Sequence, residues 1–253
     1  MLGLKGRQAD YVQAFPQAPL DDPVFIQIPQ GWKLDSTTGK LVRVEEDPAY
    51  RDSSNMIRLR RNLYGCKQAS RNLYLHLTAG LTSRGFTQST VDPCLYIRHD
   101  CIIILYTDDC CVFAHDSSVI KAVIADLAQD FVLKDEGEIE DFLGIHVTKT
   151  VGTDDTTRIE MTQTGLINSI LQDVGLHDND PKTKRTPAAD ILHPSDTLNL
   201  PFDAHWNYRS VIGKLNFLAQ NTRPDIAFAV HQCARYCSAP RKIHQIAVKY
   251  LCR

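Results

Sequence analysis

Short apolar runs dominate the first two thirds of the chain and predict strands. Three of them follow one another closely, at 94–98, 101–106 and 110–114. They are rich in β-branched and aromatic residues, and polar residues bound them, which is typical of buried strands. The remaining predicted strands lie at 8–14, 24–28, 56–61, 142–147 and 158–161.

Apolar residues at helical spacing predict helices between and after these strands. In 70–84 a leucine recurs every fourth position, with Ser70 as the expected N-cap and Gly85 as the stop signal. A second stripe follows Asp116 or Ser117, either of which can cap the helix, and runs to Phe131. Further helices are predicted from Thr164, as N-cap, to a stop at Gly175, and at 206–221, 224–237 and 243 to the end.

The order of these elements predicts the domain organisation. Strands cluster in residues 1–162 and helices dominate 163–253, which indicates an α+β core followed by a helical subdomain. The polar stretch 33–54 is expected to be a surface loop, and 176–204, with four prolines, a linker or irregular crossing.

Composition narrows the class of protein. With 43% hydrophobic and 23% charged residues, and no apolar run near ~18 residues, the sequence predicts an intracellular protein without a membrane span. The net charge of -2 does not indicate a broadly basic nucleic-acid-binding domain, so any such binding requires a local patch. The eight cysteines lie mostly in apolar patterns and are expected to be reduced. A zinc site from Cys94, His99 and Cys101 is an alternative whose spacing matches no usual zinc pattern.

Two adjacent carboxylates, Asp108 and Asp109, stand between two of the predicted buried strands. Like charges about 4 Å apart repel by roughly 4 kcal/mol at an effective dielectric near 20. A hairpin tip tolerates this if it faces water or holds a divalent cation, and both interpretations stay open on these residues alone. Asp10 on a separate predicted strand, with Phe15 five residues later, adds what a two-metal phosphoryl-transfer site requires. Because strand alternation would point Asp108 and Asp109 to opposite faces, the tip must bend if both face the same ions.

Seven segments, in order, then resemble one family. The chain is similar to copia-type (Pseudoviridae) retrotransposon reverse transcriptases from about residue 8 to 251. The matches are 10–15 to D-V-x-x-A-F, 24–32 to V-Y-M-x-x-P-x-G-F, 63–71 to L-Y-G-L-K-Q-x-x-R, 92–96 to D-P-C-x-Y, 106–109 to Y-V-D-D, 142–145 to F-L-G-I and 222–227 to T-R-P-D-I-A.

The resemblance implies a fold and a reaction. The expected fold is a reverse-transcriptase palm, an antiparallel sheet with packed helices, followed by a helical thumb and connection region. The implied activity is addition of deoxynucleoside triphosphates to a primer 3′-end on an RNA or DNA template. Asp10, Asp108 and Asp109 resemble the carboxylates that hold two Mg²⁺ ions, with Mn²⁺ as a substitute. The alternative is a catalytically inert remnant of a decayed retroelement that keeps the palm fold.

Other residues acquire roles by the same resemblance. Phe15 resembles the steric gate that selects deoxynucleotides, its alternative being a plain core aromatic. Lys67 and Gln68 resemble the segment that contacts template and incoming nucleotide, the alternative being a polar helix start, and Tyr106 of the Y-x-D-D motif is placed with them.

A second group would contact the nucleic-acid backbone. Phe142, Leu143 and Gly144 resemble the primer grip, a tight hairpin, against the alternative of a buried strand with a glycine bulge. Arg58, Arg60 and Arg61 could contact phosphates or form a solvated strand face.

The chain also departs from the family pattern. Thr107 replaces the usual valine, which we expect to be tolerated, and Pro16 to Pro19 replaces an asparagine-glycine pair. Only nine residues precede Asp10, so most of the fingers and the ribonuclease H domain of the parent polyprotein are expected to be missing. We therefore expect weak activity from this chain alone. The resemblance places such a protein in cytoplasmic virus-like particles.

Overall fold

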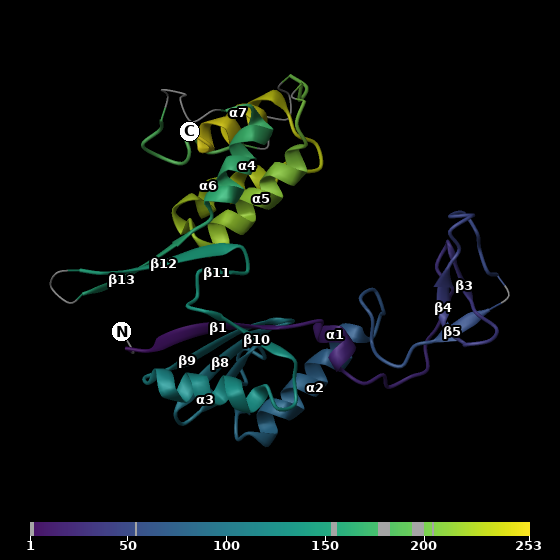
Figure 1. Cartoon of the computed structure of the whole chain (residues 1–253). Coiled ribbons are helices and arrows are strands. Elements are labelled where there is room, and N and C mark those ends of the chain that lie inside the picture. The colour runs from purple at the N-terminus through teal and green to yellow at the C-terminus, as the bar shows by residue number, and fades with distance from the viewer. Residues whose placement is uncertain (1–2, 54, 153–155, 177–182, 194–199, 204) are drawn as a thin grey trace. The chain divides into compact units, whose positions relative to one another are not determined.

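The computed structural model describes residues 3–53, 55–152, 156–176, 183–193, 200–203 and 205–253 (Figure 1). The chain divides into two compact units, Met1–Ile139 and Glu140–Arg253, and each is described by itself. No helix in the described ranges is both long and apolar enough to span a bilayer.

The first unit is built on a six-stranded antiparallel sheet. Its strands are β1 (Lys5–Tyr11), β6 (Thr87–Gln88), β7 (Leu95–Arg98), β8 (Cys101–Tyr106), β9 (Asp109–Ala114) and β10 (Leu133–Gly137). They lie in the order β10-β1-β9-β8-β7-β6, and β7, β8 and β9 are the consecutive apolar runs of the sequence.

Two helices, α2 (Ala69–Ser83) and α3 (Ser117–Leu127), cover one face of this sheet (Figure 1). Alternate strand residues such as Ala9, Ile103 and Val112 point into that layer and are fully buried. The three predicted leucines of α2 bury against them. The opposite face of the sheet carries Asp10 and Asp109, because the side-chain period of a strand is two.

The ends of these helices test the capping predictions. Gly85 has a φ of +79° just after α2, as a glycine stop signal requires. Asp116 caps α3 by accepting a hydrogen bond from the Ser118 backbone N–H. The predicted Ser70 cap is wrong: α2 begins one residue earlier, and Gln68 occupies the N-cap position without a side-chain hydrogen bond.

The stretch 33–54 is not wholly a loop, so that prediction is wrong. It contributes to the hairpin of β3 (Trp32–Leu34) and β4 (Leu41–Arg43), while β2 (Phe25–Gln27) pairs with β5 (Met56–Arg58). The β3–β4 turn is closed by the Asp35 carboxylate, which accepts hydrogen bonds from the backbone N–H groups of Thr37 and Thr38. Strands of only three residues, such as β3 and β4, are too short for an alternating pattern to show in the sequence.

The second unit joins a small sheet to a group of helices. The strands β11 (Asp141–Phe142), β12 (Ile145–Val151) and β13 (Thr157–Thr162) pair in the order β11-β12-β13, and β13 confirms the predicted strand at 158–161. The predicted strand 142–147 is interrupted after Phe142 by a turn. The helices are α4 (Thr164–Val174), α5 (Tyr208–Asn221), the 3₁₀ turn η2 (Pro224–Ile226), α6 (Ala227–Ala234) and α7 (Lys242–Leu251).

Their core is apolar and includes Val174, Val211 and Val230. Gly175 ends α4 with a φ of +69°, as predicted, but Thr164 is the first helical residue and not the N-cap, a position that Gln163 occupies. The β11–β13 sheet belongs to the same compact unit as the helices, so the boundary between the two units lies after Ile139. The sequence pattern predicted a boundary after residue 162. The assignment of palm and thumb to the two segments stays a prediction.

One contact in the first core gives a stability prediction. A Cβ on Gly80 of α2 would lie 2.5 Å from the Phe131 ring. That ring is itself held by edge contacts with Tyr11 and His76, with centroids 5.7 and 5.1 Å away. Gly80→Ala should therefore destabilise α2 by about 1–3 kcal/mol, despite the helix preference for alanine.

Gly213 of α5 is the matched control, because a Cβ there meets no atom within 4 Å. Gly213→Ala should stabilise α5 by about 1 kcal/mol. Native-state hydrogen exchange of the α2 and α5 amides measures both free energies of opening. Stabilisation of α2 by Gly80→Ala would contradict the packing described.

Candidate active site

The Asp108–Asp109 pair lies at the β8–β9 hairpin. Tyr106 pairs with Asp109, so Thr107 and Asp108 form a two-residue turn. Thr107, the first residue of the turn, has a φ of +57°. Glycine usually occupies this position in such turns, because it adopts a positive φ without strain. A β-branched residue there is strained, at a cost of about 1–3 kcal/mol, and such strain is concentrated at functional sites.

The turn resolves the problem of two adjacent carboxylates on one strand. Asp108 belongs to the turn and Asp109 is the first residue of β9, so strict strand alternation does not separate them. The hydrogen bonding between β1 and β9 extends to the turn, because the Tyr11 backbone N–H donates to the Asp108 carbonyl oxygen at 3.1 Å.

The register between β1 and β9 brings the third carboxylate to the same place. Asp10 pairs directly with Asp109 across the two strands. Directly opposed residues have Cβ atoms about 4.5–5.5 Å apart and share one face of the sheet. Residues 99 positions apart in the sequence thus become nearest neighbours on the face that α2 and α3 leave open.

The electrostatics of the three aspartates are mutually unfavourable. Partial burial raises the pKa of the Asp109 carboxyl, and the charges of Asp108, Asp10 and Glu136 raise it further. Partial burial likewise raises the pKa of Asp10, followed by the effects of Glu136 and Asp108, while Lys134 lowers it. The site is therefore a concentration of negative charge that a bound cation would relieve.

Lys134 and Glu136 of β10 are site residues that the sequence reasoning missed. Lys134 pairs directly with Asp10, and its Nζ lies 3.1 Å from the Glu136 carboxylate. Glu136 falls at a β-bulge, because Gln8 pairs with Gly137 and Ala9 with Asp135. Bulges re-aim side chains beside functional sites. The charged stretch 134–138 was the available signal, but the register that brings it to Asp10 could not be read from sequence.

The carboxylates do not form a ready-made ligand set. Within the described ranges no three His, Cys, Asp or Glu side chains are arranged to hold a metal ion, and this includes the zinc alternative at Cys94, His99 and Cys101. The donor chemistry still suits a hard divalent cation, since Mg²⁺ prefers carboxylate oxygens. Asp10, Asp108 and Asp109 are the residues that could supply them.

Phe15 lies in the short helix α1 (Ala14–Gln17), which follows β1 directly. It is half-buried, packing on the first core and meeting the exposed Tyr64 ring edge-on, with centroids 4.6 Å apart. This position is compatible with both the gate and the core interpretations. At the start of α2, Lys67 is exposed and Gln68 half-buried, while Tyr106 is 52% exposed at the end of β8.

The proposed primer-grip residues belong to the second unit. Leu143 and Gly144 form a two-residue turn between β11 and β12, with φ values of +51° and +76°. Two positive φ angles are the signature of a type I′ hairpin. A tight hairpin therefore exists here, with the Leu143 side chain exposed and Phe142 half-buried.

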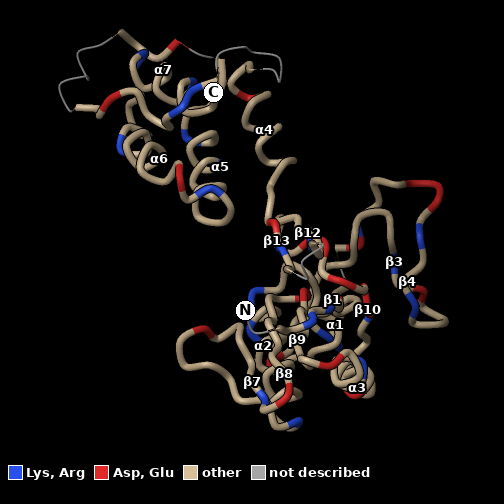
Figure 2. Tube along the Cα trace, turned by 90° about the vertical axis from the view of Figure 1, so that its left-hand side faces the viewer, with Lys and Arg blue, Asp and Glu red and all other residues tan. Residues whose placement is uncertain are grey.

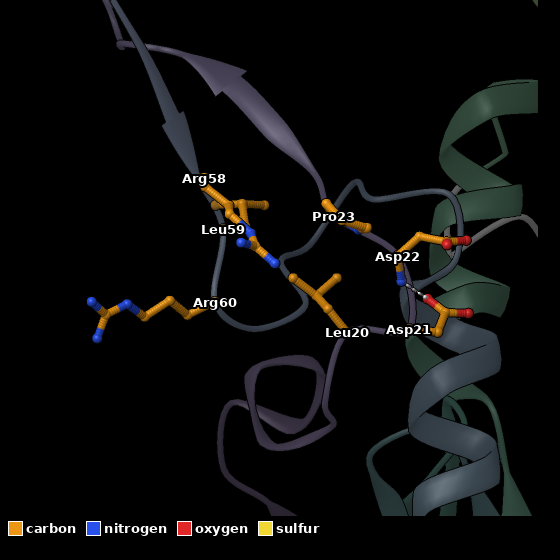
Figure 3. Close-up of a pocket in the computed structure, with 7 residues that line it drawn as sticks. All are labelled: Leu20, Asp21, Asp22, Pro23, Arg58, Leu59 and Arg60. Carbon is orange, nitrogen blue, oxygen red and sulfur yellow. Dashed lines mark hydrogen bonds between the residues drawn. The ribbon is translucent and has the colours of Figure 1, made fainter.

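Two of the candidate phosphate-binding arginines line a cavity. Arg58 and Arg60 border a space of about 620 Å³ in the first unit. Figure 3 shows the Arg58 guanidinium directed between Leu20 and Pro23, whereas Arg60 extends away. The other lining residues are Asp21, Asp22 and Leu59. Arg61 is instead engaged, donating to the Gln17 carbonyl at 3.3 Å. Along the described part of the trace, basic and acidic positions are interspersed (Figure 2).

Comparison with known proteins decides the family. Residues 6–189 match the family described as reverse transcriptase (RNA-dependent DNA polymerase). The chain belongs to this reverse transcriptase family. The match includes every site residue discussed above, from Asp10 to Gly144.

Curated relatives of this reverse transcriptase chain are retrotransposon proteins. Over its whole length it is 28% identical to the retrovirus-related Pol polyprotein from transposon TNT 1-94 of Nicotiana tabacum, and the match covers 18% of that protein. Over 98% of its length it is 30% identical to the retrovirus-related Pol polyprotein from transposon RE1 of Arabidopsis thaliana, and the match covers 16% of that protein. A putative transposon Ty5-1 protein of Saccharomyces cerevisiae is 26% identical over 93% of the chain and 71% of that protein. The chain thus spans less than a fifth of the two plant polyproteins.

The raised pKa of Asp109 gives a stability prediction with a definite sign. The pKa of the Asp109 carboxyl is higher in the folded chain than its ordinary value of 3.8. The folded state is therefore less stable once the carboxyl ionises, and stability falls as the pH rises from 3.8 through the folded-state pKa. Asp109→Asn removes the charge, so at pH 7 without divalent cations it should raise the melting temperature. The gain should shrink as the pH falls toward 4, because a raised pKa means that the Asp109 carboxylate of the folded chain takes up a proton more readily.

Asp100→Asn is the control of opposite sign. A hydrogen bond from Arg98 lowers the pKa of the Asp100 carboxyl, so its removal should lower the melting temperature at pH 7. Thermal melts in EDTA at pH 4 and 7 measure both effects. A melting temperature of Asp109→Asn at or below wild type at pH 7 would contradict the raised pKa described for this carboxyl.

Proposed function

We propose that this chain carries the palm of an RNA-directed DNA polymerase of a retrotransposon. It adds deoxynucleotides to a primer 3′-end, on an RNA or DNA template. The observation that carries the proposal is the direct pairing of Asp10 with Asp109, beside Asp108, on the uncovered face of an antiparallel sheet. Family membership supports the reaction class.

The three aspartates have one role in this proposal. Asp10, Asp108 and Asp109 would hold two Mg²⁺ ions, or Mn²⁺ as a substitute, through carboxylate oxygens. Bound there, the ions would lower the pKa of the primer 3′-hydroxyl and stabilise charge on the triphosphate and the departing pyrophosphate. In the reaction the 3′-oxygen forms a bond to the α-phosphorus, the hydroxyl proton is lost, and the bond from that phosphorus to the pyrophosphate oxygen breaks.

Lys134 and Glu136 extend this role. Lys134 opposes Asp10 in the register and is paired with Glu136. Glu136 adds to the negative charge around the aspartates, and the positive charge of Lys134 offsets part of that repulsion at Asp10 before cations bind.

The remaining residues would bind substrates. Phe15 would press on the sugar of the incoming nucleotide and exclude a ribose 2′-hydroxyl. Tyr106, Lys67 and Gln68 would contact the nucleotide and template. This is consistent with the exposure of Tyr106 and Lys67.

The second unit would bind the primer. The exposed type I′ turn at Leu143–Gly144, next to Phe142, supports a primer grip, because a hairpin tip can lie along a phosphate backbone. Residues 1–162 would then form the palm with a remnant of the fingers, and 163–253 the thumb and connection region. In this proposal the protein works in the cytoplasmic virus-like particle of its element, on a primed template, together with the fingers and ribonuclease H portions of the polyprotein.

The alternative is an inert remnant of a decayed element that keeps the palm fold and its metal site but has no working cleft. It predicts that divalent cations bind at Asp10 and Asp108 without supporting nucleotide addition.

Single-nucleotide addition to a primed template tests the proposal. With the chain in excess over primer, Mg²⁺ should support slow addition of the matched deoxynucleotide. Asp108→Asn should reduce the rate about 10³-fold or more, because a metal-bound transition state loses a ligand. Asp130→Asn, on the surface after α3, is the control and should retain the wild-type rate.

Equal rates for wild type and Asp108→Asn would reject the catalytic assignment. A wild-type chain that adds no nucleotide under these conditions would support the inert alternative.

A further inference from the structure

The segment that carries Phe15 is fixed by two polar side chains outside the aspartate cluster. After α1 the backbone at 18–19 lies outside the six-stranded sheet and has one isolated antiparallel bridge, between Pro19 and Arg61. Asn62 adds a side-chain donor: its Nδ2 lies 3.0 Å from the Ala18 oxygen and 2.8 Å from the Pro19 oxygen. Asn62 is almost fully buried, so these bonds are shielded from water.

The Asn62 side chain is itself held in place. Its Oδ1 accepts a hydrogen bond from Asn72 Nδ2 of α2 at 3.3 Å, and Asn72 also donates to the Asp21 carboxylate at 2.8 Å. The chain from Ala18 to Asp21 is thereby tied to the first turns of α2, the helix whose start carries Gln68. Both polar atoms of the Asn62 side chain are thus hydrogen-bonded, which fixes the orientation of its amide.

Gln17 fixes the other side of α1. Its Nε2 donates to the carbonyl oxygens of Val12 at 2.7 Å and Val132 at 3.0 Å, and its Oε1 accepts from the Val132 backbone N–H at 2.7 Å. One side chain thus joins α1 to the end of β1 and to the residue just before β10.

Phe15 lies in the stretch 12–19 that these hydrogen bonds hold, because Gln17 closes it back to Val12 and Asn62 holds its end at Ala18 and Pro19. Asn62 also stands two residues before Tyr64, whose ring meets Phe15 edge-on. A shift at residue 62 would therefore move both partners of that aromatic pair, whereas a rigid pair is what discrimination of one hydroxyl group requires.

We propose that Asn62 and Gln17 are positioning residues that lock the Phe15 segment in place and so set the preference for deoxyribonucleotides over ribonucleotides. The selectivity part of this proposal rests on the proposed function, but the locking part does not.

Nucleotide selectivity provides the first test. Asn62→Ala and Gln17→Met should each lower the ratio of kcat/KM for a deoxynucleotide to kcat/KM for the ribonucleotide with the same base, by about tenfold or more. A purely structural role would lower both values together and leave the ratio unchanged. Asn221→Ala is the control, since Asn221 also donates a side-chain hydrogen bond to a carbonyl, that of Phe217 in α5, and should leave the ratio at the wild-type value.

Hydrogen exchange provides a second test that needs no catalysis. Asn62→Ala should speed hydrogen exchange of the Ala18 amide, which donates to the Phe15 carbonyl, by about tenfold. Gln17→Met should speed exchange of the Val132 amide, which donates to Gln17 Oε1, by about the same factor. The β8–β9 amides should keep their protection. Gln17 is only half-buried, so Gln17→Met tests the proposal even if Asn62→Ala does not fold.

The outcomes separate this inference from the proposed function. An unchanged selectivity ratio in folded, active variants overturns it, as does unchanged exchange at Ala18 and Val132. If the wild-type chain adds no nucleotide, the proposed function and the selectivity part fall together, and the exchange result alone decides whether the Phe15 segment is locked as described.

Discussion

The antiparallel register between β1 and β9 is the constraint on which the site depends. It places Asp10 opposite Asp109 and continues to the hydrogen bond between the Tyr11 N–H and the Asp108 carbonyl. Because the side-chain period is two, a slip of one residue would send Asp10 into the helix-covered core and Ala9 to the open face. The buried Ala9 and the packing of α2 and α3 therefore fix the register, and the register brings the carboxylates together.

The same site carries costs that the rest of the first unit must support. Partial burial and then like charges raise the pKa of Asp10 and Asp109, and Thr107 occupies a backbone region that a β-branched residue seldom adopts. A well-packed sheet and helix layer beneath the open face offsets such local strain. The neighbouring Phe15 segment is stabilised differently, by buried side-chain hydrogen bonds in place of a strand ladder.

The three aspartates of the candidate site could be predicted from the sequence, but the elements and side chains around them could be predicted only in part. The apolar runs around Asp108 and Asp109 predicted the hairpin strands, and the ordered motifs identified the family that comparison then confirmed. The pairing of β1 with β10 beside Glu136 could not be predicted from the sequence. The bulge there depends on how two strands pair and leaves no fixed pattern in either strand. The β3–β4 hairpin was missed because its strands are three residues long. The Ser70 cap failed because helix starts depend on local backbone geometry that one residue type does not determine.

Cation binding measured without turnover tests the central claim most directly. Electron paramagnetic resonance of Mn²⁺ would give the affinity of the wild-type chain and of Asp10→Asn, with Asp135→Asn as the control. Asp135 lies on the same β10 strand as Lys134 but pairs with Arg7 at 2.6 Å. The account predicts that Asp10→Asn weakens Mn²⁺ binding by about tenfold or more and that Asp135→Asn does not. An Asp10→Asn variant that binds Mn²⁺ as tightly as wild type would contradict it.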